Sequence, residues 1–208
     1  MGLSRFTLFT HDKGDSVGFA FLALYQQTDS PAYGIDHHVI LNGGIYLPLA
    51  ELSAAQKYLT LPAFGQFVTR FMLTPDRFTT GLSKVYSPAL TPEEQLNMSS
   101  TFRYQGGTTV FPKTLRYLHN RDKLEKMWLQ TLSRSEIPAT LIWGEQDPIA
   151  KTEIADFVWK NHLRNRTASA SYWRLPCASH YPQNDQPIVI AQLVRRSLSE
   201  ETPAFTGV

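Results

Sequence analysis

The chain has 208 residues, of which 42% are hydrophobic, enough for one domain with a buried core and an inserted subdomain. Its formal net charge of +2, with no block of Lys or Arg residues, argues against nucleic acid as a partner. The single cysteine, Cys177, excludes an intramolecular disulfide and a cysteine-rich zinc site, and favours a reducing compartment.

The first sharp turn of the chain is expected at Asp12. Residues 6–9 form a short apolar run with β propensity, and residues 17–24 are apolar enough for a buried helix. The polar residues between them predict a strand-to-helix turn, which lifts one side chain above the strand and points backbone N–H groups at a ligand. Thr10 and Gly14 are small and leave room for this turn. The alternative is that Asp12 only caps the helix.

Residues 14–18 also spell G-x-S-x-G, the pattern of the serine-hydrolase elbow, with Ser16 as the nucleophile. An apex residue should follow the last apolar strand residue closely. Asp12 does so, whereas Ser16 would require a central strand to end in polar residues. We therefore favour Asp12 and keep Ser16 as an alternative.

A second buried strand is predicted at residues 37–42, after a loop at residues 26–35 and before Gly43. Strand, helix and strand in this order predict a right-handed βαβ unit in a parallel sheet. His37 and His38 face opposite ways on such a strand, and no ligand pattern accompanies them, so no metal site is predicted.

Helical periodicity dominates from residue 45 to residue 128 and predicts an inserted helical lid without strands. Thr91, with Pro92 and Glu94 after it, forms a capping-box start. The predicted helices are 47–59, 61–73, 92–98 and 109–129. Between them lie stretches that contain Pro62, Pro75, Gly81, Pro88 and Gly106-Gly107.

Alternation of strands and helices then returns. Strands are predicted at 137–143 and 168–175, helices at 152–163 and 186–198, and a frayed tail at 199–208. Asp12, Asp147 and His180 each follow a predicted strand, so they should meet at the carboxyl edge of the sheet. The expected segments are 1–45 (first part of the core), 46–128 (helical cap), 129–200 (second part of the core) and 201–208 (tail).

Three motifs in this order resemble those of α/β-hydrolases with an aspartate nucleophile, the group of epoxide hydrolases and haloalkane dehalogenases. They are residues 10–14 (Thr-His-Asp-Lys-Gly), 143–148 (Trp-Gly-Glu-Gln-Asp-Pro) and 179–183 (Ser-His-Tyr-Pro-Gln). The elbow, residues 41–45, 103–104 and 180–182 look most like the branch of the mesoderm-specific transcript protein. The resemblance covers nearly the whole chain. It implies the C-terminal part of an α/β-hydrolase parallel sheet with an inserted helical cap.

The resemblance also implies a mechanism. Asp12 would attack a saturated electrophilic carbon and form an alkyl ester with the enzyme. His180, oriented by Asp147, would deprotonate the water that opens this ester, and the backbone N–H of Lys13 would stabilise the oxyanion. No cofactor is implied.

An epoxide is favoured over a halide as the substrate. Epoxide hydrolases protonate the leaving alkoxide with lid tyrosines, and Tyr58 and Tyr117 lie at spacings similar to those of that pair. Tyr46 and Tyr104 are competing donors, and each lid tyrosine has packing as its alternative role. Dehalogenases commonly carry Trp after the nucleophile, where this chain has Lys13.

Family members carry four strands and two helices ahead of the elbow, with a His-Gly-x-Pro loop that gives a second oxyanion donor. Met1 stands almost directly before the strand that should be central, so the sequence resembles the C-terminal two-thirds of a hydrolase. This predicts a chain that is weakly active or inactive alone. The alternatives are a non-catalytic remnant or interaction module, a haloalkane dehalogenase, or a serine esterase that uses Ser16.

The expected partner is a small hydrophobic substrate, an epoxide or an alkyl halide. The exposed sheet edge also invites self-association. Neither a signal peptide nor an apolar run of membrane length occurs in the sequence, so a cytoplasmic location without a membrane span is expected.

Overall fold

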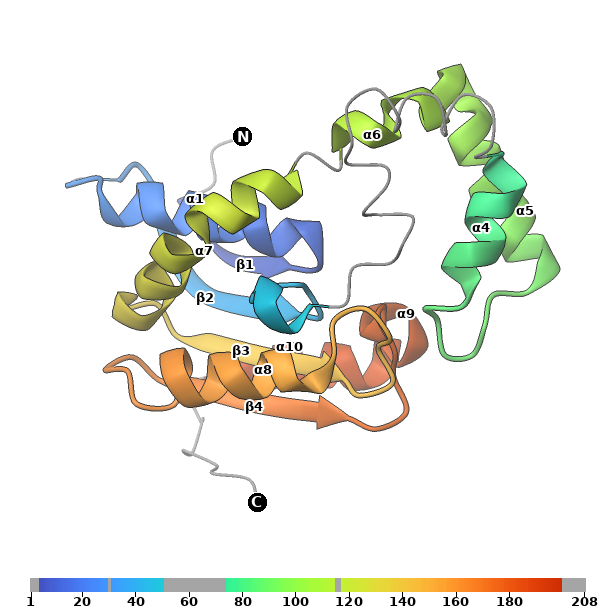
Figure 1. Cartoon of the computed structure of the whole chain (residues 1–208). Coiled ribbons are helices and arrows are strands. Elements are labelled where there is room, and N and C mark those ends of the chain that lie inside the picture. Colours follow the sequence, from blue (N-terminus) through green and yellow to red (C-terminus); the bar gives the residue numbers. More distant parts are fainter. Residues whose placement is uncertain (1–3, 30, 51–73, 115–116, 200–208) are drawn as a thin grey trace.

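The computed structural model describes residues 4–29, 31–50, 74–114 and 117–199, and its centre is a parallel four-stranded sheet (Figure 1). The strand order is β1-β2-β3-β4. The strands are β1 (Arg5–Thr10), β2 (Gly34–Leu41), β3 (Ala139–Gly144) and β4 (Ala170–Leu175). The predicted parallel sheet is therefore confirmed. Among the described residues, β1 and β4 form its two edges.

Helices cover both faces of the sheet, which explains why most residues of β2 and all residues of β3 are buried. On one face pack α1 (Lys13–Gln26), α7 (Tyr117–Arg134) and α8 (Thr152–Val158), around Phe19, Trp128, Leu141, Trp143 and Ile154. On the other face packs α10 (Pro187–Leu198), whose Ile190 contacts the cluster that contains Val39 and Ile142. Successive residues of a strand point to opposite layers, so Leu141 and Ile142 belong to different clusters.

The described residues between β2 and β3 form helices, turns and coil, and α4 and α5 lie to one side of the sheet (Figure 1). Helix α5 (Pro92–Arg103) begins with the predicted capping box, in which the Thr91 and Glu94 side chains bond reciprocally to the backbone. Helix α4 (Pro75–Ser83) was not expected, because Pro75 and Gly81 predict a loop. The structure corrects this: Thr74 caps the helix and Pro75 occupies its first turn, where no N–H is needed.

The predicted helix 109–129 is wrong in its extent. The chain instead forms η2 (Tyr104–Val110), α6 (Phe111–Thr114) and then α7, which continues to Arg134. Gln105 and Gly106 have positive φ angles of 49° and 66°, which interrupt helical geometry.

Only the start of the predicted helix 47–59 is described, and it is a 3₁₀ turn, η1 (Leu47–Leu49). The predicted helix 61–73 and Tyr58 lie outside the described residues.

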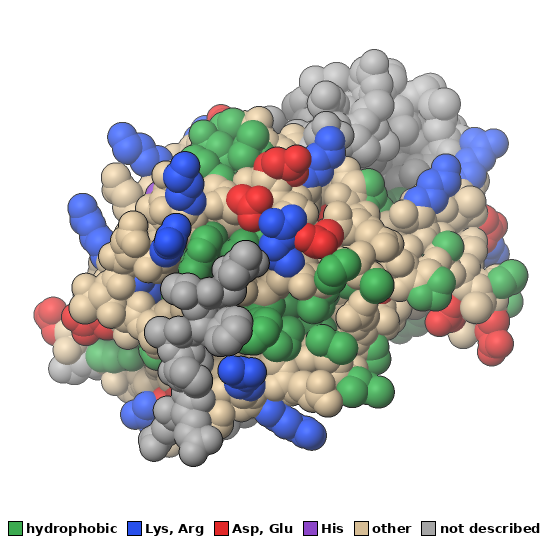
Figure 2. Space-filling model, turned by 90° about the horizontal axis from the view of Figure 1, so that it is seen from below, with side chains coloured by type: hydrophobic (Ala, Val, Ile, Leu, Met, Phe, Trp, Pro, Cys, Tyr) green, Lys and Arg blue, Asp and Glu red, His purple; other side chains and the backbone are tan. Residues whose placement is uncertain are grey.

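The remaining predictions differ from the structure mainly at their ends. Helix 152–163 exists as α8 followed by η3 (Trp159–Leu163), a π-helical turn, and a short helix α9 (Pro182–Asp185) precedes α10. On the face seen from below in Figure 2, Lys and Arg side chains are scattered, some of them beside Asp and Glu side chains, and hydrophobic side chains lie between them. None of the helices within the described ranges is long and apolar enough to cross a membrane.

Candidate active site

Asp12 occupies the sharp turn between β1, which ends at Thr10, and α1, which begins at Lys13. Its backbone has φ 51° and ψ −114°, a conformation that a residue with a side chain adopts only when its surroundings impose it. The backbone N–H of Asp12 donates to the Asn42 carbonyl at 3.0 Å, which ties the turn to the end of β2. The Asp12 side chain makes no capping hydrogen bond and is 34% exposed. It therefore stands free at the apex and does not serve as a helix cap.

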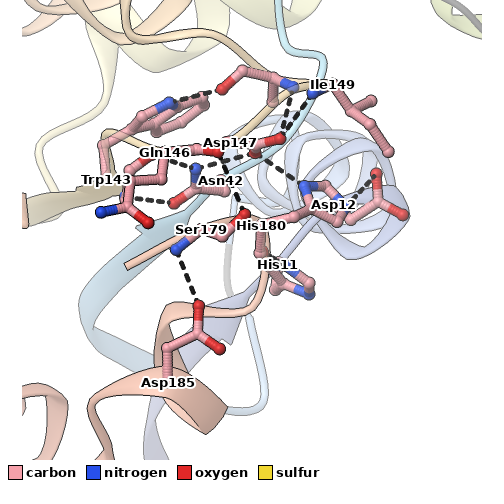
Figure 3. A network of polar contacts seen from close by, with 12 residues as sticks. His11, Asp12, Asn42, Trp143, Gln146, Asp147, Ile149, Ser179, His180 and Asp185 are labelled. Carbon is pink, nitrogen blue, oxygen red and sulfur yellow. Dashed lines mark hydrogen bonds and ion pairs between the residues drawn. The ribbon is translucent and has the colours of Figure 1, made fainter. Parts of the chain in front are cut away.

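His180 faces Asp12 from the loop after β4 (Figure 3). The His180 Nε2 atom lies 3.8 Å from Asp12 Oδ1, and its Nδ1 atom lies 2.8 Å from Asp147 Oδ2. Because Asp147 accepts a hydrogen bond from Nδ1–H, the imidazole presents Nε2 to Asp12. The structure thus brings together the three residues that the sequence placed after separate strands.

Asp147 is rigidly held, and its side chain has no exposed surface. Its Oδ1 atom accepts hydrogen bonds from the backbone N–H groups of Ile149 at 2.7 Å and Ala150 at 2.9 Å. Its Oδ2 atom accepts from the Asn42 amide at 2.9 Å as well as from His180. A buried carboxylate with this many donors is held in one orientation.

Asn42 is a site residue to which the sequence analysis gave no role. Its Nδ2 group donates to Asp147 and to the Gly144 carbonyl at 3.0 Å, and its Oδ1 atom accepts from the Gly144 N–H at 2.7 Å. Asn42 therefore joins the ends of β2 and β3 and orients the acid. Asn42 could have been predicted from its position, because it directly follows β2 on the same carboxyl edge of the sheet as the other candidate residues.

The loop that carries His180 is fixed by several segments. The His180 N–H donates to the Val85 carbonyl at 3.1 Å, and the Ser179 N–H donates to Asp185 Oδ2 at 2.7 Å. The other Asp185 oxygen accepts from the Ser87 N–H at 3.0 Å. Gly144 lets this loop approach β3, because a Cβ at this position would collide with the Ser179 carbonyl oxygen.

Charges around His180 favour its protonated form. Burial alone would lower the pKa of His180, but the hydrogen bond and charge of Asp147, with the charges of Asp12 and Asp15, outweigh burial and raise it. The neighbouring His11 behaves in the opposite way, because burial and the charge of His180 lower its pKa.

His11, which the sequence analysis did not single out, supports the His180 loop. As a neutral ring, His11 donates from Nε2 to the His180 carbonyl at 2.6 Å. Its ring also lies 4.9 Å from that of Tyr181, which stacks on Tyr86 at 4.3 Å. Nothing in the sequence marks this contact, since the two histidines are distant along the chain.

The other predicted residues lie at different distances from this centre. Burial, and next the charge of Asp12, raises the pKa of the Tyr117 hydroxyl to about 12. The Lys13 ammonium lies 5.6 Å from the Tyr117 ring centre. Tyr46 stacks on Phe157 of α8, with ring centres 3.9 Å apart, and Tyr104 is 71% exposed.

Ser16 lies inside the first turns of α1 and is 6% exposed. Its Oγ atom accepts hydrogen bonds from Arg121 at 2.9 Å and 2.7 Å. No hydrogen bond among the described residues joins Ser16 to a histidine.

His37 and His38 are buried and neutral. His37 contacts the Thr140 hydroxyl at 2.9 Å and His38 the Thr10 hydroxyl at 3.0 Å, so they face opposite sides of β2. Burial lowers their pKa values to about 4 and about 3. In the part of the chain that the structure describes, no three His, Cys, Asp or Glu residues are grouped as a metal site would require.

Relatives of known sequence resemble this chain, one over most of its length and another over about a third of it. The mesoderm-specific transcript protein of Mus musculus is 28% identical over 186 residues, which are 88% of this chain and 55% of that protein. Epoxide hydrolase 4 of Homo sapiens is 38% identical over 68 residues, which are 31% of this chain and 17% of that protein. The chain thus spans about half the length of the mouse relative. No protein-family model matches it.

Solved structures identify the fold. An α/β-hydrolase fold protein from Burkholderia ambifaria superposes with a TM-score of 0.69 at 14% identity, covering 92% of this chain and 65% of that one. The haloalkane dehalogenase DbeA from Bradyrhizobium elkani superposes with a TM-score of 0.68 at 16% identity, covering 93% and 66%. The chain therefore has the parallel sheet and helices of the α/β-hydrolase fold, as the motifs predicted.

Proposed function

We propose that the chain provides the catalytic residues of a hydrolase that acts through an ester between Asp12 and a small hydrophobic substrate. The observation that carries this proposal is the facing pair of Asp12 Oδ1 and His180 Nε2, 3.8 Å apart, with Asp147 behind the imidazole at 2.8 Å. This order of nucleophile, base and acid is what a two-step displacement requires.

In the first step, an Asp12 carboxylate oxygen attacks a saturated carbon of the substrate. For an epoxide, the bond between that carbon and the ring oxygen breaks, and the alkoxide takes a proton from the Tyr117 hydroxyl. The raised pKa of Tyr117, about 12, keeps this hydroxyl protonated until the alkoxide forms. Tyr46 and Tyr104 are weaker candidates, since one is stacked on Phe157 and the other is largely exposed.

In the second step, His180 takes a proton from water at Nε2, and the hydroxide attacks the carboxyl carbon of Asp12. The Lys13 N–H stabilises the oxyanion that forms there, because the start of α1 directs backbone N–H groups toward the turn. The acyl C–O bond then breaks, and the departing alkoxide takes the proton from the His180 imidazolium to leave as the alcohol. The second proton of the water is lost from the Asp12 carboxyl and returns to the Tyr117 phenolate, so that Asp12, His180 and Tyr117 are all regenerated. Asp147 holds the proton on Nδ1 and stabilises the imidazolium.

An epoxide is the substrate class that we favour. A tyrosine near Asp12 suits an alkoxide leaving group, whereas the residue after Asp12 is Lys13 and offers no indole N–H to a halide. The partial similarity to epoxide hydrolase 4 agrees with this choice, and the fold similarity to haloalkane dehalogenases makes an alkyl halide the second candidate.

Trapping tests the proposal directly. The variant His180→Ala keeps Asp12 but lacks the base, so exposure to an aryl epoxide should add one substrate mass, located on Asp12 by peptide mass spectrometry. The double variant Asp12→Asn/His180→Ala is the control and should stay unmodified. An adduct on Ser16 would instead support a serine esterase.

Lack of any adduct with an epoxide, an alkyl bromide or an aryl ester would contradict catalysis by this chain. That result would favour the alternative, a non-catalytic interaction module.

A further inference from the structure

Arg121 links helix α7 to the turn at Asp12, although the two are far apart in sequence. The Arg121 side chain is 2% exposed. Its Nε and Nη2 groups donate to Ser16 Oγ at 2.9 Å and 2.7 Å, and Nη2 also donates to the backbone carbonyl of Asp12 at 3.1 Å. The guanidinium thus binds the backbone on which the nucleophile stands.

The surroundings of Arg121 are unusual for a buried cation. No ion pair between Arg121 and a carboxylate occurs among the described residues. Asp15 is close enough for the Arg121 charge to lower its pKa, although burial dominates and raises that pKa to about 8. Gly44 leaves room for the guanidinium, since a Cβ there would lie 2.5 Å from Nη1. The guanidinium carbon of Arg121 also lies 5.0 Å from the centre of the Tyr117 ring. A buried charge held by a hydroxyl, a carbonyl and an aromatic ring, without a carboxylate partner, costs stability, so a purely structural role explains it poorly.

The bond to the Asp12 carbonyl has a geometric consequence. The C=O group of Asp12 and the N–H group of Lys13 belong to the same planar trans peptide unit, in which they point in opposite directions. A donor that holds the carbonyl therefore also fixes the direction of the N–H. The turn conformation at Asp12, with φ 51°, is strained and needs such support.

We propose that Arg121 is a positioning residue that orients the Lys13 N–H toward the oxyanion by holding the other end of the same peptide unit, with Ser16 fixing the guanidinium. The inference rests on the proposed function, because it assigns Arg121 to the second step. Arg121 itself does not touch the substrate. It acts on ester hydrolysis, in which the oxyanion forms on Asp12, and not on the first displacement.

The ratio of the rate of ester hydrolysis to the rate of Asp12 alkylation tests this role. Arg121→Met should slow hydrolysis of the alkyl-enzyme by about 100-fold, the loss typical of one oxyanion donor. With an alkyl bromide, whose departure does not depend on Tyr117 or on the contact of Tyr117 with Arg121, alkylation of Asp12 should change by less than about threefold. The ester should therefore accumulate and be seen as intact-protein mass during turnover. Arg121→Lys should recover at least tenfold of the loss, because an ammonium can still reach the Asp12 carbonyl.

Arg166 offers a matched control. It is a partly buried arginine that, like Arg121, donates to backbone carbonyls, those of Leu132, Ile137 and Ser169, but none of these hydrogen bonds reaches the Asp12 turn. Arg166→Met should lower the free energy of unfolding without changing the ratio of the rates of the two steps. Ser16→Ala is a smaller change and should fold. Like Arg121→Met, it should slow ester hydrolysis relative to the alkylation of Asp12.

A second measurement does not depend on activity. The residual dipolar coupling of the Lys13 amide reports the direction of that N–H bond, and it should change in Arg121→Met and Ser16→Ala but not in Arg166→Met. Equal losses in both steps, or an unchanged Lys13 coupling, would overturn the inference. If His180→Ala forms no adduct on Asp12, the proposed function fails, while the coupling still decides whether Arg121 orients Lys13.

Discussion

The Nε2 atom of His180 lies 3.8 Å from Oδ1 of Asp12, although the two residues lie near opposite ends of the chain. This separation is too long for a direct hydrogen bond and leaves both groups available to a third molecule. The pair therefore has the separation that the proposed roles of nucleophile and base require.

The pH dependence of ester hydrolysis should report the ionisation of His180. A base must be neutral, and in the free protein the hydrogen bond and charge of Asp147, with the charge of Asp12, raise the pKa of His180 despite its burial. Esterification removes the charge of Asp12, so the rate of alkyl-enzyme breakdown should increase with pH, with a midpoint below the pKa of His180 in the free protein. Single-turnover kinetics between pH 5 and pH 9 and NMR titration of His180 in the free protein measure the two values, and a rate that falls as the pH rises would contradict the arrangement.

Replacement of Tyr117 should separate the two substrate classes. Tyr117→Phe removes the proton donor, so epoxide opening should fall by about 100-fold, within the range that general acids contribute. Alkylation by an alkyl bromide should change little, because bromide leaves without a proton. Tyr104→Phe is the matched control, since Tyr104 is 71% exposed. Equal loss with both substrates would indicate that Tyr117 only shapes the site.

Removal of the Asn42 amide should weaken both the fold and the site. Asn42→Ala breaks hydrogen bonds to Asp147 and to both backbone groups of Gly144. We expect a loss of about 2–4 kcal/mol in the free energy of unfolding, because buried partners are left unpaired. Urea denaturation measures this loss. Asn42→Asp, which keeps the shape but adds a charge next to Asp147, should be at least as damaging, and a neutral effect of either variant would argue against the role of Asn42.

Two glycine substitutions are expected to change the free energy of unfolding in opposite directions, and one of them tests the packing next to Asp147. Gly144→Ala would place a Cβ against the Ser179 carbonyl oxygen, so it should cost about 1–3 kcal/mol or more in unfolding free energy. Gly81→Ala meets open space within helix α4 and should stabilise by about 0.5–1 kcal/mol. Thermal unfolding of the two variants should therefore move in opposite directions, and a tolerated Gly144→Ala would show that the His180 loop can shift.

Asp15 should make stability decrease as the pH rises. Burial raises the pKa of folded Asp15 to about 8, so the folded state prefers the protonated acid, whereas the unfolded chain ionises near 3.8. Stability from this group is complete below the lower value and is lost as the pH rises to the higher one.

The variant Asp15→Asn does not titrate at this position. Its advantage in unfolding free energy over the parent should therefore grow between about pH 4 and pH 8, by at most about 1.4 kcal/mol per pH unit. Denaturation at a series of pH values measures it. A constant difference would mean that Asp15 is ionised in the folded protein.

The sequence alone determined the strand-turn-helix unit around Asp12, the parallel sheet and the order of the site residues. These features depend on patterns within short windows, such as the apolar run before Asp12 and the capping box at Thr91, and local chemistry is enough to specify them. Local patterns failed where two signals competed. Pro75 and Gly81 indicated a loop, yet the cap at Thr74 and the place of Pro75 in the first turn made helix α4 possible.

Only the tertiary structure decided which residues support the site. Asn42 reaches Asp147, His11 reaches the His180 loop and Arg121 reaches Ser16 only because the parallel sheet gathers its carboxyl ends and α7 packs against α1. Such contacts join residues that are distant in the chain, and their geometry depends on the packing of whole elements. Ser16 illustrates the difference, because its motif reads as a nucleophile while its position in the fold makes its hydroxyl the acceptor for a buried arginine.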